Sequence, residues 1–185
     1  MLAAPFGGDE VKKASRSLVC LIALVLALCA GCSSGVKTSS STPLLPSEAR
    51  LNGMYEHCQT IQVKDGASTA EFKTATLPSL NPITVNAVLK RSNGMHINGT
   101  WKGTPLAAVL DSVGVARPYK QLRVEAWDGY VGRVAYDVAA RPDTIIAYEQ
   151  DGKPLPRDDG PARLVVASED GFFWIRMITR IEVIR

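Results

Sequence analysis

The chain from about Leu51 onward consists mostly of short segments in which apolar and polar residues alternate, separated by Gly and Pro. Alternation with a period of two is typical of strands that have one buried face. In the segment 121–127, Leu122, Val124 and Ala126 share one face, and Asp128-Gly129 predicts a hairpin turn into the next strand. Seven or eight strands are expected, drawn from 59–63, 83–89, 95–101, 121–127, 130–136, 144–148, 163–167 and 172–184.

One segment has the spacing of an amphipathic helix, with apolar residues at i, i+3, i+4 and i+7: Leu106, Val109, Leu110 and Val113. Thr104 is expected as its N-cap, Pro105 as its first residue and Gly114 as the residue that follows its C-terminus. A shorter helical turn is expected at 136–140. Many strands with one or two packed helices predict an α+β fold with a mixed or antiparallel sheet, in a single domain over 51–185.

The first 31 residues follow a different pattern. A positive segment with Lys12, Lys13 and Arg16 precedes the apolar run 18–28, which is too short to span a bilayer as a mature helix. Together they predict a signal peptide at 1–31. The sequence Leu-Cys-Ala-Gly-Cys that ends at Cys32 resembles the lipobox of bacterial lipoproteins. That resemblance implies lipidation, with palmitate-type acyl chains, at Cys32; the alternatives are an ordinary secretory peptide or an uncleaved N-terminal anchor.

Residues 32–50 begin with a polar stretch rich in Ser and Thr, which predicts a flexible tether. The first expected partner is therefore a membrane, reached through the lipid anchor, with the domain in the cell envelope facing the periplasm or the exterior. The chain carries a formal charge of +3, and removal of three basic and two acidic leader residues leaves +2. So small a charge argues against a nucleic-acid partner.

Only Cys58, of the four cysteines, belongs to the expected domain, so that domain has no internal disulfide. Cys58 is interpreted as a buried small apolar residue, an intermolecular partner or a reactive thiol. Adjacent His57 and Cys58 on a strand would point to opposite faces, so no metal site is predicted. The acidic pairs 158–159 and 169–170 each precede Gly and are interpreted as solvated turns.

Five short blocks, in this order, resemble the sulfite-oxidase-like molybdopterin-binding domain over roughly residues 59–185. The blocks are WKGTPLAAVL at 101–110, DGY at 128–130, IAYEQDGKPLP at 146–156, GPARLVV at 160–166 and ITRIEV at 178–183. The resemblance implies a molybdopterin cofactor whose metal is bound by a cysteine in a loop at the end of an early strand. The comparable stretch 85–93, VNAVLKRSN, contains no cysteine, and its amide, amine and hydroxyl groups do not replace a soft thiolate.

The resemblance also suggests residues that would contact the pterin. A late Ser-x-Lys-Trp segment of the family corresponds, aligned through 179–181, to Trp174-Ile-Arg176-Met177 here. Arg176 is a candidate to bind a phosphate with two hydrogen bonds, and Trp174, Tyr130 and Arg133 are further cofactor-binding candidates. The aromatic run 172–174 is interpreted either as core or as the lip of an apolar, pterin-like pocket.

Three functional hypotheses follow. In the first, the protein is a lipid-anchored binding or accessory module that has the fold without the metal-ligating cysteine. In the second, it is an active oxidoreductase that binds molybdopterin through Arg176, Arg133 and backbone groups. Its ligation would be atypical, with the metal bound by a ligand other than cysteine or by Cys58. In the third, it is a structural envelope protein. A small-molecule or pterin ligand and a redox protein are the expected partners besides the membrane, and no motif of another enzyme class is present.

Overall fold

The computed structural model describes residues 46–90, 93–169 and 171–185. The expected signal peptide, Cys32 and most of the expected tether lie outside these residues. Helix α1 (Pro46–His57) begins the described part, and the sequence did not predict it. Its first five residues belong to the stretch 32–50, so the end of that stretch is helical. No helix among the described residues combines the length and apolar character needed to cross a membrane.

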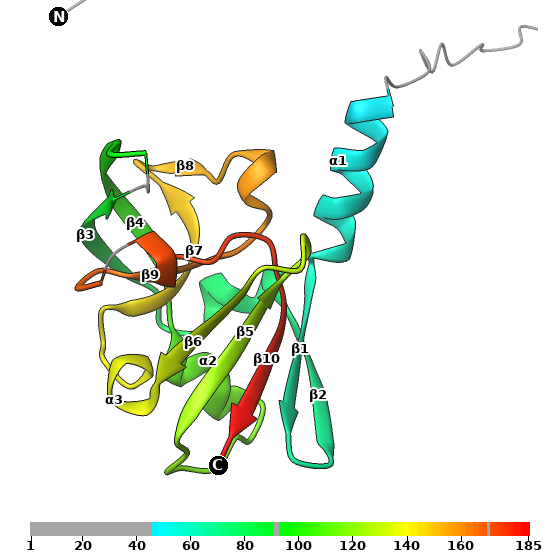
Figure 1. The fold of residues 1–185 in the computed structure, drawn as a ribbon, viewed down its shortest axis with the longest axis vertical. Coiled ribbons are helices and arrows are strands. Elements are labelled where there is room, and N and C mark those ends of the chain that lie inside the picture. Colours follow the sequence, from blue (N-terminus) through cyan, green and yellow to red (C-terminus); the bar gives the residue numbers. More distant parts are fainter. Residues whose placement is uncertain (1–45, 91–92, 170) are drawn as a thin grey trace, which may run out of the picture. The chain divides into compact units, whose positions relative to one another are not determined.

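One sheet has five strands in the order β2-β1-β10-β5-β6 (Figure 1). It is mixed, because β1 runs parallel to β10 while the other neighbours pair antiparallel. The parallel pair joins the first and last strands of the described residues, with Gln62 opposite Arg180 and Val63 opposite Ile181. The strands are β1 (Thr60–Asp65), β2 (Ser68–Lys73), β5 (Gln121–Ala126), β6 (Val131–Ala135) and β10 (Ile178–Ile184).

The second sheet is antiparallel, with the order β3-β4-β7-β8 and with β9 paired to β7. Its strands are β3 (Ile83–Lys90), β4 (His96–Pro105), β7 (Thr144–Gln150), β8 (Lys153–Pro154) and β9 (Arg163–Val166). The register of β4 on β7 shifts between Lys102 and Gly103. A side chain at position 103 would place its Cβ 2.4 Å from the carbonyl oxygen of Ile146, so this irregular pairing requires glycine.

The expected helix is α2 (Leu106–Ser112), but it begins later than the sequence suggested. Thr104 is not its N-cap: the residue lies within β4, and its hydroxyl donates to the carbonyl of Leu77 at 2.6 Å. Pro105 takes the N-cap position instead. Gly114 does follow the C-terminus, with φ +78°, and its N–H donates to Asp111 while that of Val115 donates to Leu110. These two bonds form a Schellman motif.

The remaining helices are short. The expected turn at 136–140 is α3 (Tyr136–Ala139). The described part of the chain also has three 3₁₀ helices, at Thr74–Ser79 (η1), Arg157–Asp159 (η2) and Gly171–Phe173 (η3). The prediction of a strand over 172–184 is wrong in its first half, because β10 begins only at Ile178. Strand β2 and η1 were not predicted.

A single large core joins the two sheets to α2. Its fully buried members include Ile61, Leu122 and Ile181 from the mixed sheet, Ile145 and Leu164 from the antiparallel sheet, and Leu106, Val109 and Leu110 from α2. The architecture is the expected α+β fold, rich in strands with few helices.

Helix α1 packs against the loops next to β5, η2 and β10. Met54 belongs to a small buried cluster with Cys58 and Met177. The guanidinium of Arg50 lies 5.7 Å from the ring centroid of Trp127, and that of Arg157 lies 5.2 Å from the ring centroid of Tyr55. Each contact is of the cation–π type. The helix therefore contacts three separate loops of the domain.

Candidate functional site

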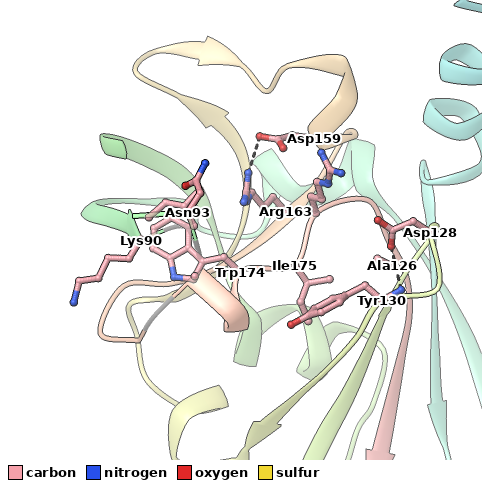
Figure 2. A pocket seen from close by; sticks show the side chains of 12 residues that line it. Lys90, Asn93, Ala126, Asp128, Tyr130, Asp159, Arg163, Trp174 and Ile175 are labelled. Atoms are coloured by element: carbon pink, nitrogen blue, oxygen red, sulfur yellow. Dashed lines mark hydrogen bonds and ion pairs between the residues drawn. The ribbon is translucent and has the colours of Figure 1, made fainter. Parts of the chain in front are cut away.

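A cavity of about 440 Å³ lies where loops from both sheets converge (Figure 2). The end of β3, the end of β5 with the turn that follows it, η2, the start of β9 and the segment from η3 to β10 all contribute to its wall. Its size is within the range of small-molecule sites. The lining residues are Leu89, Lys90, Asn93, Ala126, Asp128, Tyr130, Asp159, Arg163, Gly171, Trp174, Ile175 and Arg176.

Part of the wall is apolar and firmly packed. Leu89, Trp174 and Ile175 are all buried. The indole N–H of Trp174 donates to the carbonyls of Val166, at 2.8 Å, and Glu169, at 3.2 Å. Its ring packs edge to face on Trp101, with centroids 5.3 Å apart and an interplanar angle of 84°. Trp174 is thus both a core residue and part of the cavity wall, so the two interpretations of the aromatic run do not exclude each other.

A buried ion pair forms the polar side of the cavity. Arg163 Nη1 donates to a carboxylate oxygen of Asp159 at 2.7 Å, and the two side chains are only 7% and 12% exposed. The Arg163 guanidinium also lies 5.6 Å from the ring centroid of Trp101. The interpretation of 158–159 as solvated is therefore wrong for Asp159, although Asp158 is exposed. Burial of these charges depends on their pairing.

A second arginine lies directly across from the first. Arg163 and Arg176 are partners in an isolated antiparallel bridge, in which the N–H of Leu164 donates to the carbonyl of Ile175 at 2.7 Å. Directly opposed residues place their side chains on the same face. The Arg176 side chain is exposed and donates a long bond, 3.4 Å, to the carbonyl of Asp158. Among the described residues, no carboxylate forms an ion pair with Arg176.

The turn between β5 and β6 supplies the opposite rim. The N–H of Tyr130 donates to the Asp128 carboxylate at 3.1 Å, and Gly129 adopts φ +84°. Tyr130 is 45% exposed, which is high for a residue with a large ring. Across the cavity, Lys90 ends β3, and its side chain extends away from the other labelled residues (Figure 2).

The structure brings together three of the four residues expected to contact a cofactor. Trp174, Tyr130 and Arg176 line the same cavity. Arg133 does not: it is an exposed residue of β6, opposite Arg123 on β5. Sequence reasoning missed the pair Asp159–Arg163. The two residues are four positions apart in the sequence, a spacing that allows an ion pair. Nothing in the sequence, however, distinguished them from ordinary solvated charges.

The other acidic residues and the histidine considered from the sequence do not form a site. Glu169 is not simply solvated, because its carboxylate forms an ion pair with Arg141 at 3.3 Å. Asp170 lies outside the described residues. His57 ends α1 rather than lying on a strand, and no group of three metal-ligating side chains occurs among the described residues.

The thiol of Cys58 is buried, with no exposed surface, next to Met54 and Met177. Burial, with a smaller contribution from Asp128, raises its pKa to about 11. The sulfur is therefore a protonated thiol at neutral pH, and Cys58 is not among the residues that line the cavity. Of the three interpretations of Cys58, a buried small apolar residue is the one that agrees with its position.

The donor set of the cavity does not fit a bound molybdenum of the family's kind. Its described lining residues offer nitrogen and oxygen groups and hydrocarbon, with no sulfur. From the stretch 85–93, it is Leu89, Lys90 and Asn93 that reach the cavity. A thiolate prefers softer metals than these groups do. An organic anion, in contrast, would find both cationic groups and an apolar wall there.

Comparisons with known proteins agree with this architecture. The model of the oxidoreductase molybdopterin-binding domain matches residues 54–185, and the chain belongs to that family. Among solved structures, the sulfane dehydrogenase SoxCD from Paracoccus pantotrophus is similar, with a TM-score of 0.62 and 21% identity. The match covers 69% of this chain but only 39% of that one, so the likeness concerns the fold. No curated protein matches the sequence.

Proposed function

We propose that this protein is a lipid-anchored extracytoplasmic binding or accessory module, which keeps the molybdopterin-binding fold without ligating the metal. The observation that carries this proposal is the end of β3. In the family, a metal-binding cysteine is expected at this place. Here the buried residue at the end of β3 that lines the cavity is Leu89, which is only 3% exposed. A hydrocarbon side chain has no electron pair to give to a metal.

Little room also remains between the end of β3, next to Leu89, and the segment that begins at Gly171. A Cβ built on Gly171 would lie 2.1 Å from the carbonyl oxygen of Lys90 and 3.0 Å from Leu89 Cδ1. The segment that begins η3 therefore approaches the end of β3 as closely as glycine permits. The thiol of Cys58 offers no substitute, because it is buried in the cluster with Met54 and Met177.

Metal analysis tests this proposal. The full chain would be produced together with the machinery that makes the molybdenum cofactor, as wild type, Cys58→Ser and Leu89→Cys, and molybdenum per protein would be measured by mass spectrometry. We expect no stoichiometric molybdenum in the wild type or in Cys58→Ser. Stoichiometric molybdenum in the wild type would overturn the proposal, and its loss in Cys58→Ser would establish the oxidoreductase alternative. Molybdenum gained only by Leu89→Cys would show that a thiol is the missing ligand.

The location of the module is supported by the sequence up to Cys32, with its positive segment, apolar run and lipobox-like end. Cells labelled with palmitate would carry the label on the wild-type protein, which would sediment with membranes, and Cys32→Ser would abolish both. Label or membrane association that survives in Cys32→Ser would contradict a lipid anchor at this residue.

A redox protein is the further partner in this proposal. It is supported by the family and by the similar solved structure, which is a dehydrogenase. As an accessory module, this chain would bind such a partner rather than transfer electrons through a metal of its own.

A further inference from the structure

Strand β3 has one edge that no strand among the described residues covers. It stands at the end of the order β3-β4-β7-β8, and β4 is the strand paired with it (Figure 1). The backbone N–H and C=O groups that point away from β4 therefore have no strand partner within the described part of the chain. Such an edge is a template for a further strand.

Proteins commonly protect a free edge with charged side chains, proline, bulges or a short strand. The segment 83–89, ITVNAVL, has none of these features. Its pairing with β4 continues without a shift of register, from Ile83 opposite Gly103 to Leu89 opposite Ile97. On its outer face Val88 is 38% exposed, although it is apolar. This edge is therefore regular, uncharged and open to pairing.

The other edge strands that the structure describes are protected. In the mixed sheet, β2 carries Glu71 and Lys73, and β6 has only five residues and carries Arg133. In the antiparallel sheet, β8 has two residues, one of which is Pro154, and β9 has four. The contrast indicates that the edge of β3 is kept free for a partner.

The sequence of this edge is complementary to itself. A Cβ built on Gly171 would lie 2.1 Å from the carbonyl oxygen of Lys90, so η3 approaches the strand there and the open segment ends at Leu89. Asn86 is the middle residue of 83–89. Antiparallel pairing of two copies about Asn86 would place Thr84 opposite Val88 and Asn86 opposite itself.

This register suits both faces of the sheet. Directly opposed residues share a face, so the core-facing residues of the two copies would stay on the core side. The two Asn86 amides, each with donors and an acceptor, can hydrogen-bond to each other. No charged residue lies within the paired segment, so no like charges oppose each other.

We propose that β3 pairs with β3 of a second copy of this chain, antiparallel and about a twofold axis at Asn86. The two antiparallel sheets then form one continuous sheet. A contact of this length is small for a protein interface, so its affinity in free solution is low. The inference rests on the proposed function in one respect: a lipid anchor confines the copies to one membrane and raises their effective concentration.

Cysteines at the outward positions of β3 test the register. Membranes from cells that produce the full chain would be treated with copper phenanthroline, and dimers would be read on a non-reducing gel. Asn86→Cys should cross-link to itself, because opposed Cα atoms about 4.5–5.5 Å apart suit a disulfide. Thr84→Cys or Val88→Cys alone should not cross-link, whereas the two together in one chain should. Thr69→Cys, at an exposed position of β2, measures random collision.

Two charge variants of the Thr84→Cys/Val88→Cys chain form a matched pair. Asn86→Asp keeps the oxygen that accepts the Thr100 hydroxyl at 3.1 Å, but it places two carboxylates opposite each other across the axis. The initial rate of cross-linking should fall at least roughly threefold. Asn98→Asp makes the same change at an exposed position of β4, away from the edge, and should leave the rate unchanged.

Each outcome decides for or against the pairing. Asn86→Cys that cross-links no faster than Thr69→Cys, or equal rates in Asn86→Asp and Asn98→Asp, would overturn the inference; the edge would then be open to a strand of another protein. Palmitate-labelled protein that does not cross-link would refute this inference and leave the lipid anchor standing. Cross-linking of unlabelled protein would support the pairing and contradict the anchor.

Discussion

Replacement of Asp159 by Asn should lower the stability of the domain. The substitution keeps the size of the side chain but removes the negative charge that lies 2.7 Å from Arg163 Nη1. In the folded state Arg163 is then a cation, 7% exposed, that has lost the carboxylate of Asp159. In the cavity wall, the same change raises the net charge of the lining side chains by one unit.

The magnitude follows from the burial of the pair. Removal of one partner from a buried ion pair costs about 3–5 kcal/mol. Because Asn can still accept a hydrogen bond, we expect the lower end, about 3 kcal/mol. A domain of this kind has about 5–15 kcal/mol of stability, so the variant should remain folded at room temperature. Its Tm should fall by about 6–12 °C.

The assay is urea unfolding followed by tryptophan fluorescence, because Trp101 and Trp174 lie in contact next to the pair. Asp158→Asn is the matched control: its side chain is exposed, and its effect should be within about 0.5 kcal/mol of zero. A loss below about 1 kcal/mol for Asp159→Asn would refute the argument that the pair is buried and strong.

Two other predictions concern stability alone. Burial and Asp128 raise the pKa of Cys58 to about 11. Above about pH 9 the unfolded chain therefore loses the thiol proton of Cys58 before the folded chain does. The free energy of unfolding should fall by about 2–3 kcal/mol between about pH 9 and 11. Urea unfolding of wild type and Cys58→Ala across this range would show the difference, and parallel curves would contradict it. Gly103→Ala would place a Cβ 2.4 Å from the carbonyl oxygen of Ile146 and should cost about 2–3 kcal/mol in the same assay. Gly53→Ala in α1, with nothing within 4 Å, should instead stabilise by about 0.5–1 kcal/mol, and similar effects of the two would refute the steric account.

The strands that the sequence predicted well are those with one buried face. In β5, buried and half-buried residues alternate without interruption, and the same period is legible in the sequence. Strand β2 was missed because Phe72 is its one buried residue, so it shows almost no alternation. Helix α1 was missed for a similar reason, since Met54 is buried while its neighbours are mostly exposed. Where an element buries little, its sequence carries little pattern.

Thr104 shows a second kind of error. Its hydroxyl suits an N-cap, yet tertiary contact with Leu77 in η1 uses that hydroxyl instead. The candidate site was predicted only in part for the same reason. Trp174, Tyr130 and Arg176 came from resemblance to a family, whereas Asp159 and Arg163 acquire their importance from burial that depends on the fold of η2 and β9.

Helix α1 has a practical consequence for anyone who shortens this protein. Its partners Trp127, Arg157 and Met177 each lie within two residues of a cavity side chain, namely Asp128, Asp159 and Arg176. A shortened chain that begins at β1 would lack the three contacts between α1 and the loops of the cavity. It would also expose the apolar, sulfur-containing surface formed by Cys58 and Met177. A soluble version intended for binding studies should therefore begin before Pro46.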